Sequence, residues 1–143
     1  MSSQTLPLVP RLDQVFFESP NAYMILDRQL RFVAANRAYL ELTGSRLEDL
    51  VGREILERFP HDRDDPENES ARMLRQSFER VLETGQRDDI AVIRYRVART
   101  PGGPLEDRYW SASHIPLLEN GEIAFVLQHT VDVTELHAMA RDR

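Results

Sequence analysis

Residues 109–131, which read YWSASHIPLLENGEIAFVLQHTV, carry the signal that decides the fold. Two apolar-rich runs surround Asn120-Gly121, a pair that suits a two-residue turn because both of its central residues need a positive φ. The second run continues into residues 132–135 (DVTE), a segment that ends a strand and favours the start of a helix. The sequence therefore predicts an antiparallel hairpin followed by a C-terminal helix.

A two-residue turn also predicts which side chains share a face of the sheet, because side chains alternate along a strand. One face is expected to carry Trp110, Ala112, His114 and Pro116 together with Phe125, Leu127, His129 and Val131. The other is expected to carry Ser111, Ser113, Ile115 and Leu117 together with Ala124, Val126, Gln128 and Thr130. A shift of one residue in either strand would exchange its two sets.

The residues before the hairpin predict a mixed order of helices and strands. Apolar residues at helical spacing follow Pro10, and strands are expected near residues 23–26 and 30–35. Asn36 can cap a helix that Gly44 ends, and a short helical passage follows. A long amphipathic helix is expected to end at Gly85, before a strand near residues 90–97. With the antiparallel hairpin, this order predicts an α+β fold.

Composition excludes several classes of protein. A chain of 143 residues with 41% hydrophobic and 29% charged residues fits one globular domain. A net charge of −6 argues against nucleic-acid binding. No apolar run approaches the ~18 residues that a membrane helix needs, and the N-terminus lacks a signal peptide. The absence of cysteine excludes disulfides and thiolate sites and favours a cytoplasmic location.

Several short motifs together resemble the PAS domain family, over roughly residues 10–140. They are residues 19–22 (SPNA), 36–39 (NRAY) with 42–44 (LTG), 51–53 (VGR) and 132–135 (DVTE). Further stretches are similar to PAS domains of bacterial sensor histidine kinases. These are residues 59–66 (FPHDRDDP), 77–85 (SFERVLETG) and 108–111 (RYWS).

The resemblance implies a five-stranded antiparallel sheet in the order 2-1-5-4-3, with helices that cover one face and enclose a small cavity. It also implies sensing, dimerisation and signal relay rather than catalysis, with a histidine kinase as the downstream effector. The alternative is a ligand-free protein-interaction module whose cavity is filled by its own side chains. The expected domains are a disordered lead at residues 1–9, the PAS domain at 10–132 and the start of a connector helix at 133–143.

By the same resemblance, the face with the serines points into the cavity. The residues expected to line a site for a small ligand are Met24, Leu26, Leu74, Phe78, Ser111, Ser113, Gln128 and Thr130. Buried hydroxyl and amide groups need partners, which a ligand, ordered water or other side chains can supply.

The opposite face is too apolar to leave in water, so a homodimer or the chain's own first helix is expected to cover it. The residues expected at this contact are Leu12, Val15, Phe16, Trp110, His114, Phe125, Leu127 and His129. His114 and His129 would lie diagonally on it, as a structural pair or as a pH-sensitive one.

Other chemistries have weaker support in the sequence. Flavin adduct formation needs a cysteine that the chain lacks, so only passive flavin binding stays open. Haem-binding relatives commonly use a histidine from the long helix, where this chain has none. The cofactor is therefore unknown, and the absence of one is favoured over haem or flavin. The acidic run from Asp62 does not match a calcium loop, so no metal site is expected. Ser113 and His129 are expected on opposite faces, so no nucleophile–base pair and no enzyme activity are expected.

Overall fold

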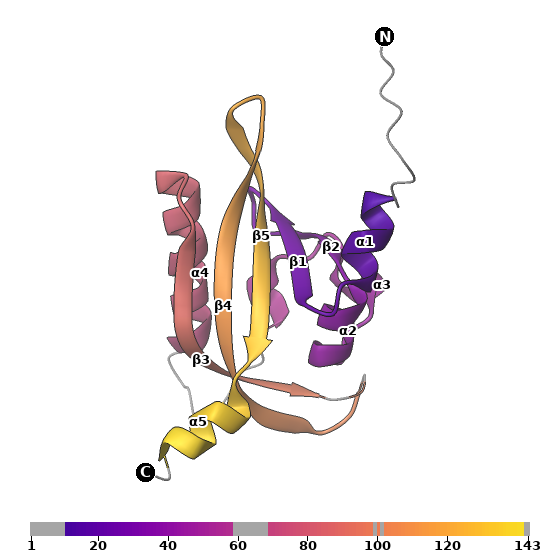
Figure 1. Cartoon of the computed structure of the whole chain (residues 1–143), viewed down its shortest axis with the longest axis vertical. Helices are drawn as coiled ribbons and strands as arrows, with labels where there is room; N and C mark the ends of the chain where they lie inside the picture. The colour runs from indigo at the N-terminus through magenta and orange to yellow at the C-terminus, as the bar shows by residue number, and fades with distance from the viewer. Residues whose placement is uncertain (1–10, 59–68, 99, 101, 142–143) are drawn as a thin grey trace.

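The computed structural model describes residues 11–58, 69–98, 100 and 102–141 (Figure 1). Its helices and strands, in chain order, are α1 (Leu12–Glu18), β1 (Ala22–Asp27), β2 (Phe32–Ala35), α2 (Arg37–Thr43), α3 (Leu47–Leu50), the 3₁₀ helix η1 (Ile55–Arg58), α4 (Glu69–Thr84), β3 (Asp88–Ala98), β4 (Leu105–Glu119), β5 (Glu122–Asp132) and α5 (Thr134–Arg141). The start of the acidic run at Asp62 lies outside the described residues.

One antiparallel sheet of five strands, in the order β2-β1-β5-β4-β3, forms the centre of the molecule. Helices α2, α3 and α4 cover one face, which we call the inner face, and α5 leaves the sheet at the end opposite the hairpin tip (Figure 1). The predicted α+β class and the predicted strand order are both confirmed.

The core lies between the inner face and the helices. Met24 and Leu26 of β1 and Val126 of β5 are fully buried beneath Phe78 and Val81 of α4. The apolar positions of α4 repeat at helical spacing, so one side of this helix packs on the sheet and the other remains polar. Burial of this apolar stripe is the main term that holds α4 in place.

Asn36 fixes how the N-terminal elements meet. Its side-chain oxygen accepts hydrogen bonds from the backbone N–H groups of Tyr23 and Tyr39, both at 3.0 Å. Its amide nitrogen donates to the carbonyl oxygens of Phe16 at 3.0 Å and Asn21 at 2.8 Å. The predicted cap is confirmed, and the same side chain also ties α1 and β1 to α2. Gly44 ends α2 with a φ of 64°, as expected.

The hairpin turn forms as predicted, but the register changes just beyond it. Asn120 and Gly121 have φ values of 53° and 82°, and Leu118 pairs with Ile123 as expected. Leu117 then pairs with Phe125, so Ala124 is an extra residue in β5 that no residue of β4 opposes. This is a β-bulge, a common feature near strand ends.

The bulge reverses the faces that we expected for β4 and leaves those of β5 unchanged. Trp110 and His114 lie on the inner face and are buried, whereas Ser111 and Ser113 lie on the other face. The expected register is therefore wrong by one residue along most of β4, because one strand contains a residue that the other does not match.

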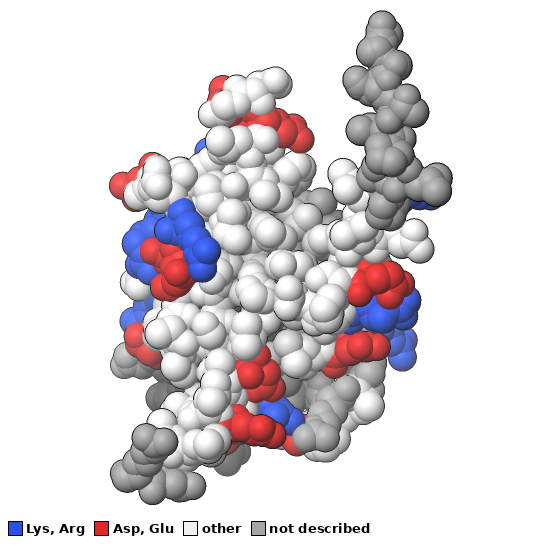
Figure 2. Space-filling view, in the orientation of Figure 1, with Lys and Arg blue, Asp and Glu red and all other residues white. Residues whose placement is uncertain are grey.

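The face turned away from α2, α3 and α4, here called the outer face, is apolar in its middle. Figure 2 shows few charged side chains over the central strands, with acidic and basic groups gathered around them. The apolar side chains that alternation places on this face are Ile25, Ile115, Leu117, Phe125, Leu127 and Val131. No helix in the described part of the chain is both long and apolar enough to cross a membrane.

Candidate functional site

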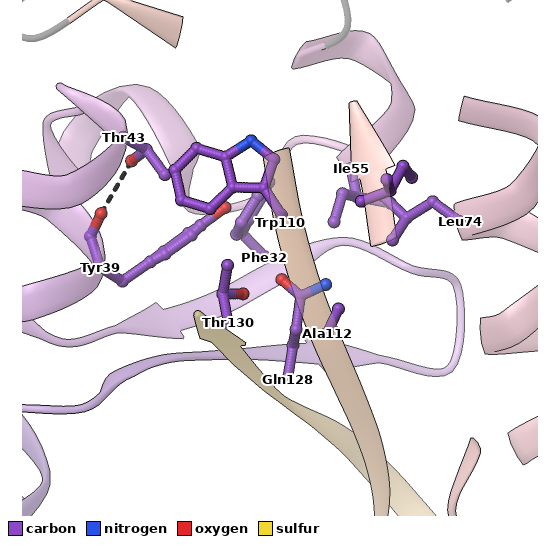
Figure 3. A pocket seen from close by; sticks show the side chains of 10 residues that line it. Phe32, Tyr39, Thr43, Ile55, Leu74, Trp110, Ala112, Gln128 and Thr130 are labelled. Atoms are coloured by element: carbon purple, nitrogen blue, oxygen red, sulfur yellow. Dashed lines mark hydrogen bonds between the residues drawn. The ribbon is translucent and has the colours of Figure 1, made fainter. Parts of the chain in front are cut away.

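A small cavity lies between the inner face of the sheet and the helices that cover it (Figure 3). Its volume is about 50 Å³, which gives room for a few water molecules or a molecule of a few heavy atoms. The residues in its wall are Phe32, Tyr39, Thr43, Ile55, Leu74, Ile93, Trp110, Ala112, Gln128 and Thr130. Apolar and aromatic side chains surround a few polar groups, which is the usual composition of a small-molecule site.

Two neighbouring residues of β5 supply polar groups to this wall. The hydroxyl oxygen of Thr130 is buried and has no hydrogen-bond partner among the described residues. The side chains of Gln128 and Thr130 stand side by side, and the carboxamide oxygen of Gln128 lies on the Thr130 side (Figure 3). A buried hydroxyl without a partner costs about 1–3 kcal/mol, which an occupant of the cavity would recover.

A chain of hydrogen bonds runs from the cavity to the protein surface. Gln128 Nε2 lies 2.9 Å from His114 Nε2, and His114 Nδ1 lies 2.6 Å from the hydroxyl of Ser77 on α4. Ser77 donates to Asp88 at 2.5 Å, and Arg80 donates two hydrogen bonds to the same carboxylate, each at 2.9 Å. We call these five residues the polar chain.

The ionisation of the polar chain follows from its surroundings. The Arg80 guanidinium, helped by the Ser77 hydroxyl, holds the pKa of Asp88 below its ordinary value. Burial lowers the pKa of His114 to about 4, against an opposing effect of Asp88 and Asp89. His114 is also stacked on Phe78, with ring centroids 4.0 Å apart. At neutral pH the chain therefore holds a neutral imidazole next to an ion pair.

The predicted cavity residues divide into three groups. Leu74, Gln128 and Thr130 do lie in the cavity wall. Met24, Leu26 and Phe78 are buried on the inner side as expected, but they are not part of the cavity wall. Ser111 and Ser113 lie on the outer face because of the bulge, and Arg87 donates to Ser113 at 3.2 Å.

The same register shift changes which of the predicted dimer-contact residues lie on the outer face. Trp110 lies in the cavity wall and His114 is fully buried in the polar chain, so neither belongs to the outer face. The expected pair of His114 with His129 is therefore wrong. Phe125, Leu127 and His129 do lie on the outer face, where His129 contacts Tyr23 with ring centroids 5.3 Å apart.

Ser113 and His129 are direct cross-strand partners on the outer face, and not on opposite faces as expected. The correction brings no nucleophile–base pair with it, because Ser113 is hydrogen-bonded to Arg87 and Asp89. Asp89, Ser113, His129 and Tyr23 form one row across β3, β4, β5 and β1.

The sequence interpretation did not identify most of the aromatic wall. Phe32 and Tyr39 come from β2 and α2, and Ile93 comes from the strand next to β4. One signal was present in β4, since Trp110 and Ala112 are apolar and the serines that alternate with them are polar. Hydrophobic patterning alone favours Trp110 inside.

The end of β5 is joined to both β4 and α5. Asp132 accepts the Thr134 N–H at 2.9 Å, and the Thr134 hydroxyl accepts the Tyr109 N–H at 3.0 Å. Thr134 is thus the first residue of α5, and Asp132 has the capping role. On the next turn, His137 stacks on Tyr109 with ring centroids 3.8 Å apart. The start of α5 is therefore held by hydrogen bonds to Asp132, two residues beyond Thr130, and to β4.

A family model for the PAS fold matches residues 16–138, nearly the whole of the described sheet and its helices. The chain belongs to the PAS family. The strand order, the covering helices and the enclosed cavity of this PAS domain agree with that assignment. Comparison with curated proteins gave no significant match.

Solved PAS structures share this fold. The PAS domain of Bordetella pertussis BvgS is 22% identical, with a TM-score of 0.62 over 92% of this chain and 90% of that one. A sensory box sensor histidine kinase from Vibrio cholerae is 25% identical, with a TM-score of 0.56 over 86% of this chain and 89% of that one. A Rhodobacter sphaeroides LOV protein is 18% identical, with a TM-score of 0.62 over 90% of this chain and 71% of that one.

Neither haem nor flavin fits the cavity as it stands. A space of about 50 Å³ would have to expand several-fold to admit a flavin ring or a porphyrin. His114, the histidine next to the cavity among the described residues, has both ring nitrogens in hydrogen bonds, so neither is available as an axial ligand. Among the described residues, no group of three or more side chains is arranged to hold a metal ion.

Proposed function

We propose that this PAS domain is a sensory and dimerisation module that relays a signal to a downstream effector. The effector in this proposal is a histidine kinase of a bacterial two-component system, and the domain acts in the cytoplasm without catalytic activity of its own. The relative from Vibrio cholerae is described as a sensor histidine kinase, and its 25% identity over most of both chains supports an effector of that kind.

The observation that carries the proposal is the unpartnered hydroxyl of Thr130 in the cavity wall. Such a group gains a hydrogen bond when a ligand enters, so the energy of β5 depends on whether the cavity is occupied. Asp132 lies two residues further along the same strand and holds the start of α5 through Thr134. A signal that begins at Thr130 thus has a short covalent path to the C-terminal helix.

Dimerisation is the second part of the proposal. The predicted contact residues that this proposal keeps are Leu12, Val15 and Phe16 of α1 and the outer-face residues of β5. Leu12 and Val15 are 77% and 50% exposed on α1, and this helix meets the outer face at its edge, where Phe16 stacks on Tyr23. A second copy of the chain would cover both surfaces, and two dimer arrangements a few kcal/mol apart would suffice for signalling.

The experiment that tests the relay is hydrogen exchange of the α5 backbone amides in Thr130→Leu, a variant that fills the cavity. The proposal expects altered exchange in α5 relative to the unchanged protein, because the larger side chain mimics occupancy. Val131→Leu is the matched control, since it adds one methylene group at the next residue on the outer face. Unchanged α5 exchange in Thr130→Leu would contradict the relay.

The ligand-free interaction module is the second candidate, and the small volume of the cavity favours it. It expects dimers in native mass spectrometry and a protein mass without any adduct. The sensory proposal expects the same dimers with a retained ligand. If the ligand exchanges freely instead, its addition should alter the hydrogen exchange of α5. A strict monomer at high concentration would contradict the dimer in both.

A further inference from the structure

Building on the proposed function, we propose that the cavity selects a small uncharged ligand that donates a hydrogen bond, with an alcohol as the simplest class. The polar chain imposes this selectivity, because it fixes the orientation of the Gln128 carboxamide. The position of each hydrogen in the polar chain fixes this orientation.

The surface end of the polar chain determines which partner donates in each of its hydrogen bonds. Ser77 has a single hydroxyl hydrogen and two neighbours that could accept it, the Asp88 carboxylate and the His114 imidazole. The carboxylate is the stronger acceptor, and its ionised form is held by Arg80. The hydrogen of Ser77 therefore goes to Asp88, which leaves its oxygen as an acceptor for His114.

The imidazole passes this direction on to the cavity. His114 must carry its proton on Nδ1 in order to donate to Ser77, and a neutral ring then has a bare Nε2. The side chain 2.9 Å from that nitrogen is the Gln128 amide, which must donate to it through Nε2. The carboxamide oxygen of Gln128 is consequently directed away from His114, on the side of Thr130 (Figure 3).

From β5 the cavity wall thus presents one fixed acceptor and one hydroxyl without a hydrogen-bond partner among the described residues. The acceptor is Gln128 Oε1, and the Thr130 hydroxyl can donate as well as accept. A ligand hydroxyl can donate to Gln128 and accept from Thr130 at the same time. A ketone of the same shape can only accept, so it would leave the Gln128 oxygen buried against an apolar group, which binding sites reject strongly.

Charge and size narrow the class further. Among the described residues that line the cavity, the phenol of Tyr39 is the one ionisable group, and the ion pair of Arg80 with Asp88 lies at the far end of the polar chain. A charged ligand would therefore lose its hydration without a counter-ion. The volume of about 50 Å³ restricts the occupant to a few heavy atoms.

The experiment compares 2-propanol with acetone, two probes with the same number of heavy atoms and nearly the same shape. ¹H–¹⁵N NMR of the whole chain follows the backbone amides of Ala112 and Thr130 and the indole N–H of Trp110, the one tryptophan in the sequence. We expect both probes to shift these signals, with 2-propanol binding about tenfold more tightly, which corresponds to about 1.4 kcal/mol.

Two variants show whether the polar chain is the cause. Ser77→Ala removes the hydroxyl that orders the chain and lets the Gln128 amide turn over, so the preference for 2-propanol should shrink to about two-fold or less. Thr130→Val removes the second polar group without a change in shape, and both probes should bind more weakly while the preference for the alcohol remains.

The outcomes separate this inference from the proposed function. Equal binding of the two probes, or tighter binding of acetone, would overturn the selectivity and leave a ligand cavity in place. Equal selectivity in Ser77→Ala would overturn the role of the polar chain. Failure of both probes to shift any signal of the cavity wall would overturn the ligand site itself, and with it both proposals.

Discussion

Asn36 is the residue on which the N-terminal half of the domain depends. It is fully buried, and all four of its side-chain hydrogen bonds go to backbone groups, in α1, β1, α2 and the segment between α1 and β1. No other residue type of this size offers both an acceptor for two N–H groups and two donors for two carbonyl oxygens.

We expect Asn36→Asp to reduce the free energy of unfolding by about 2–4 kcal/mol. The carboxylate keeps the acceptors but replaces the donors, so it would face the carbonyl oxygens of Phe16 and Asn21 with negative charge. Urea unfolding followed by circular dichroism measures the change. Asn21→Asp, at an exposed position, is the matched control and should change the stability by less than about 0.5 kcal/mol.

His114 makes the stability of the domain depend on pH. Its pKa is about 4 in the folded protein and near 6.5 in the unfolded chain, so between these values the unfolded state binds more protons. Stability therefore falls as the pH is lowered from about 6.5 to about 4, by roughly 2–3 kcal/mol over the full range. The lowered pKa of Asp88 adds a further loss only in more acidic solution.

The measurement is the urea midpoint at several pH values between 4 and 8. In His114→Gln the curve should be lower at neutral pH and nearly flat between pH 6.5 and 4. His129→Gln is the control, because it removes a histidine of the outer face and leaves the polar chain intact. An equal slope in His114→Gln would show that another group is responsible.

At the scale of the elements, periodicity and turn chemistry predicted most of what is observed. The cap at Asn36, the end of α2 at Gly44 and the turn at Asn120-Gly121 each depend on neighbouring residues in the chain. Such local signals are complete in the sequence. The strand order came from the resemblance to the PAS family and is confirmed.

The cavity wall was predicted only in part, because it depends on a register that extends beyond the turn. The expected pairing holds for Leu118 with Ile123 and fails from Leu117 onward. The bulge at Ala124 has no residue signature of its own, since alanine is neither a turn residue nor a residue that needs a special φ. The ring stack of His114 on Phe78 joins two elements distant in the chain and has no local signal either.

The reversed faces of β4 can be checked with single cysteines, because the chain contains none. In dilute folded protein, Ser111→Cys should react with a thiol reagent about as fast as a free thiol in solution does. Ala112→Cys, at a buried neighbouring position, should react only as fast as the protein opens. Fast reaction at residue 112 and protection at residue 111 would instead support the register without a bulge.

At the scale of the whole molecule, the two faces of the sheet have different roles. The inner face holds the cavity and the polar chain, and the outer face presents an apolar centre that one copy of α1 covers only at its edge, where Phe16 stacks on Tyr23. Strands β4 and β5 carry residues of the cavity wall on one face and apolar residues of the proposed dimer surface on the other, so under the proposal a change in the cavity would reach that surface through these strands.

Val15→Glu should weaken the dimer at least tenfold, because it places a charge in the proposed contact between α1 and the outer face of a second copy. Sedimentation equilibrium measures the dissociation constant. Val51→Glu is a close control, since Val51 has the same exposure as Val15, 51% against 50%, and lies in the segment between α3 and η1. Equal effects of the two variants would place the dimer contact elsewhere.

The extra residue Ala124 also limits how the gene for this domain can change in length. Loss of one codon beside the turn would remove the bulge and turn β4 over, so that its serines would face the core and Trp110 would face water. Loss of one codon from each strand would shorten the hairpin and preserve both faces. Among descendants of this sequence, insertions and deletions in the hairpin should therefore survive in compensating pairs.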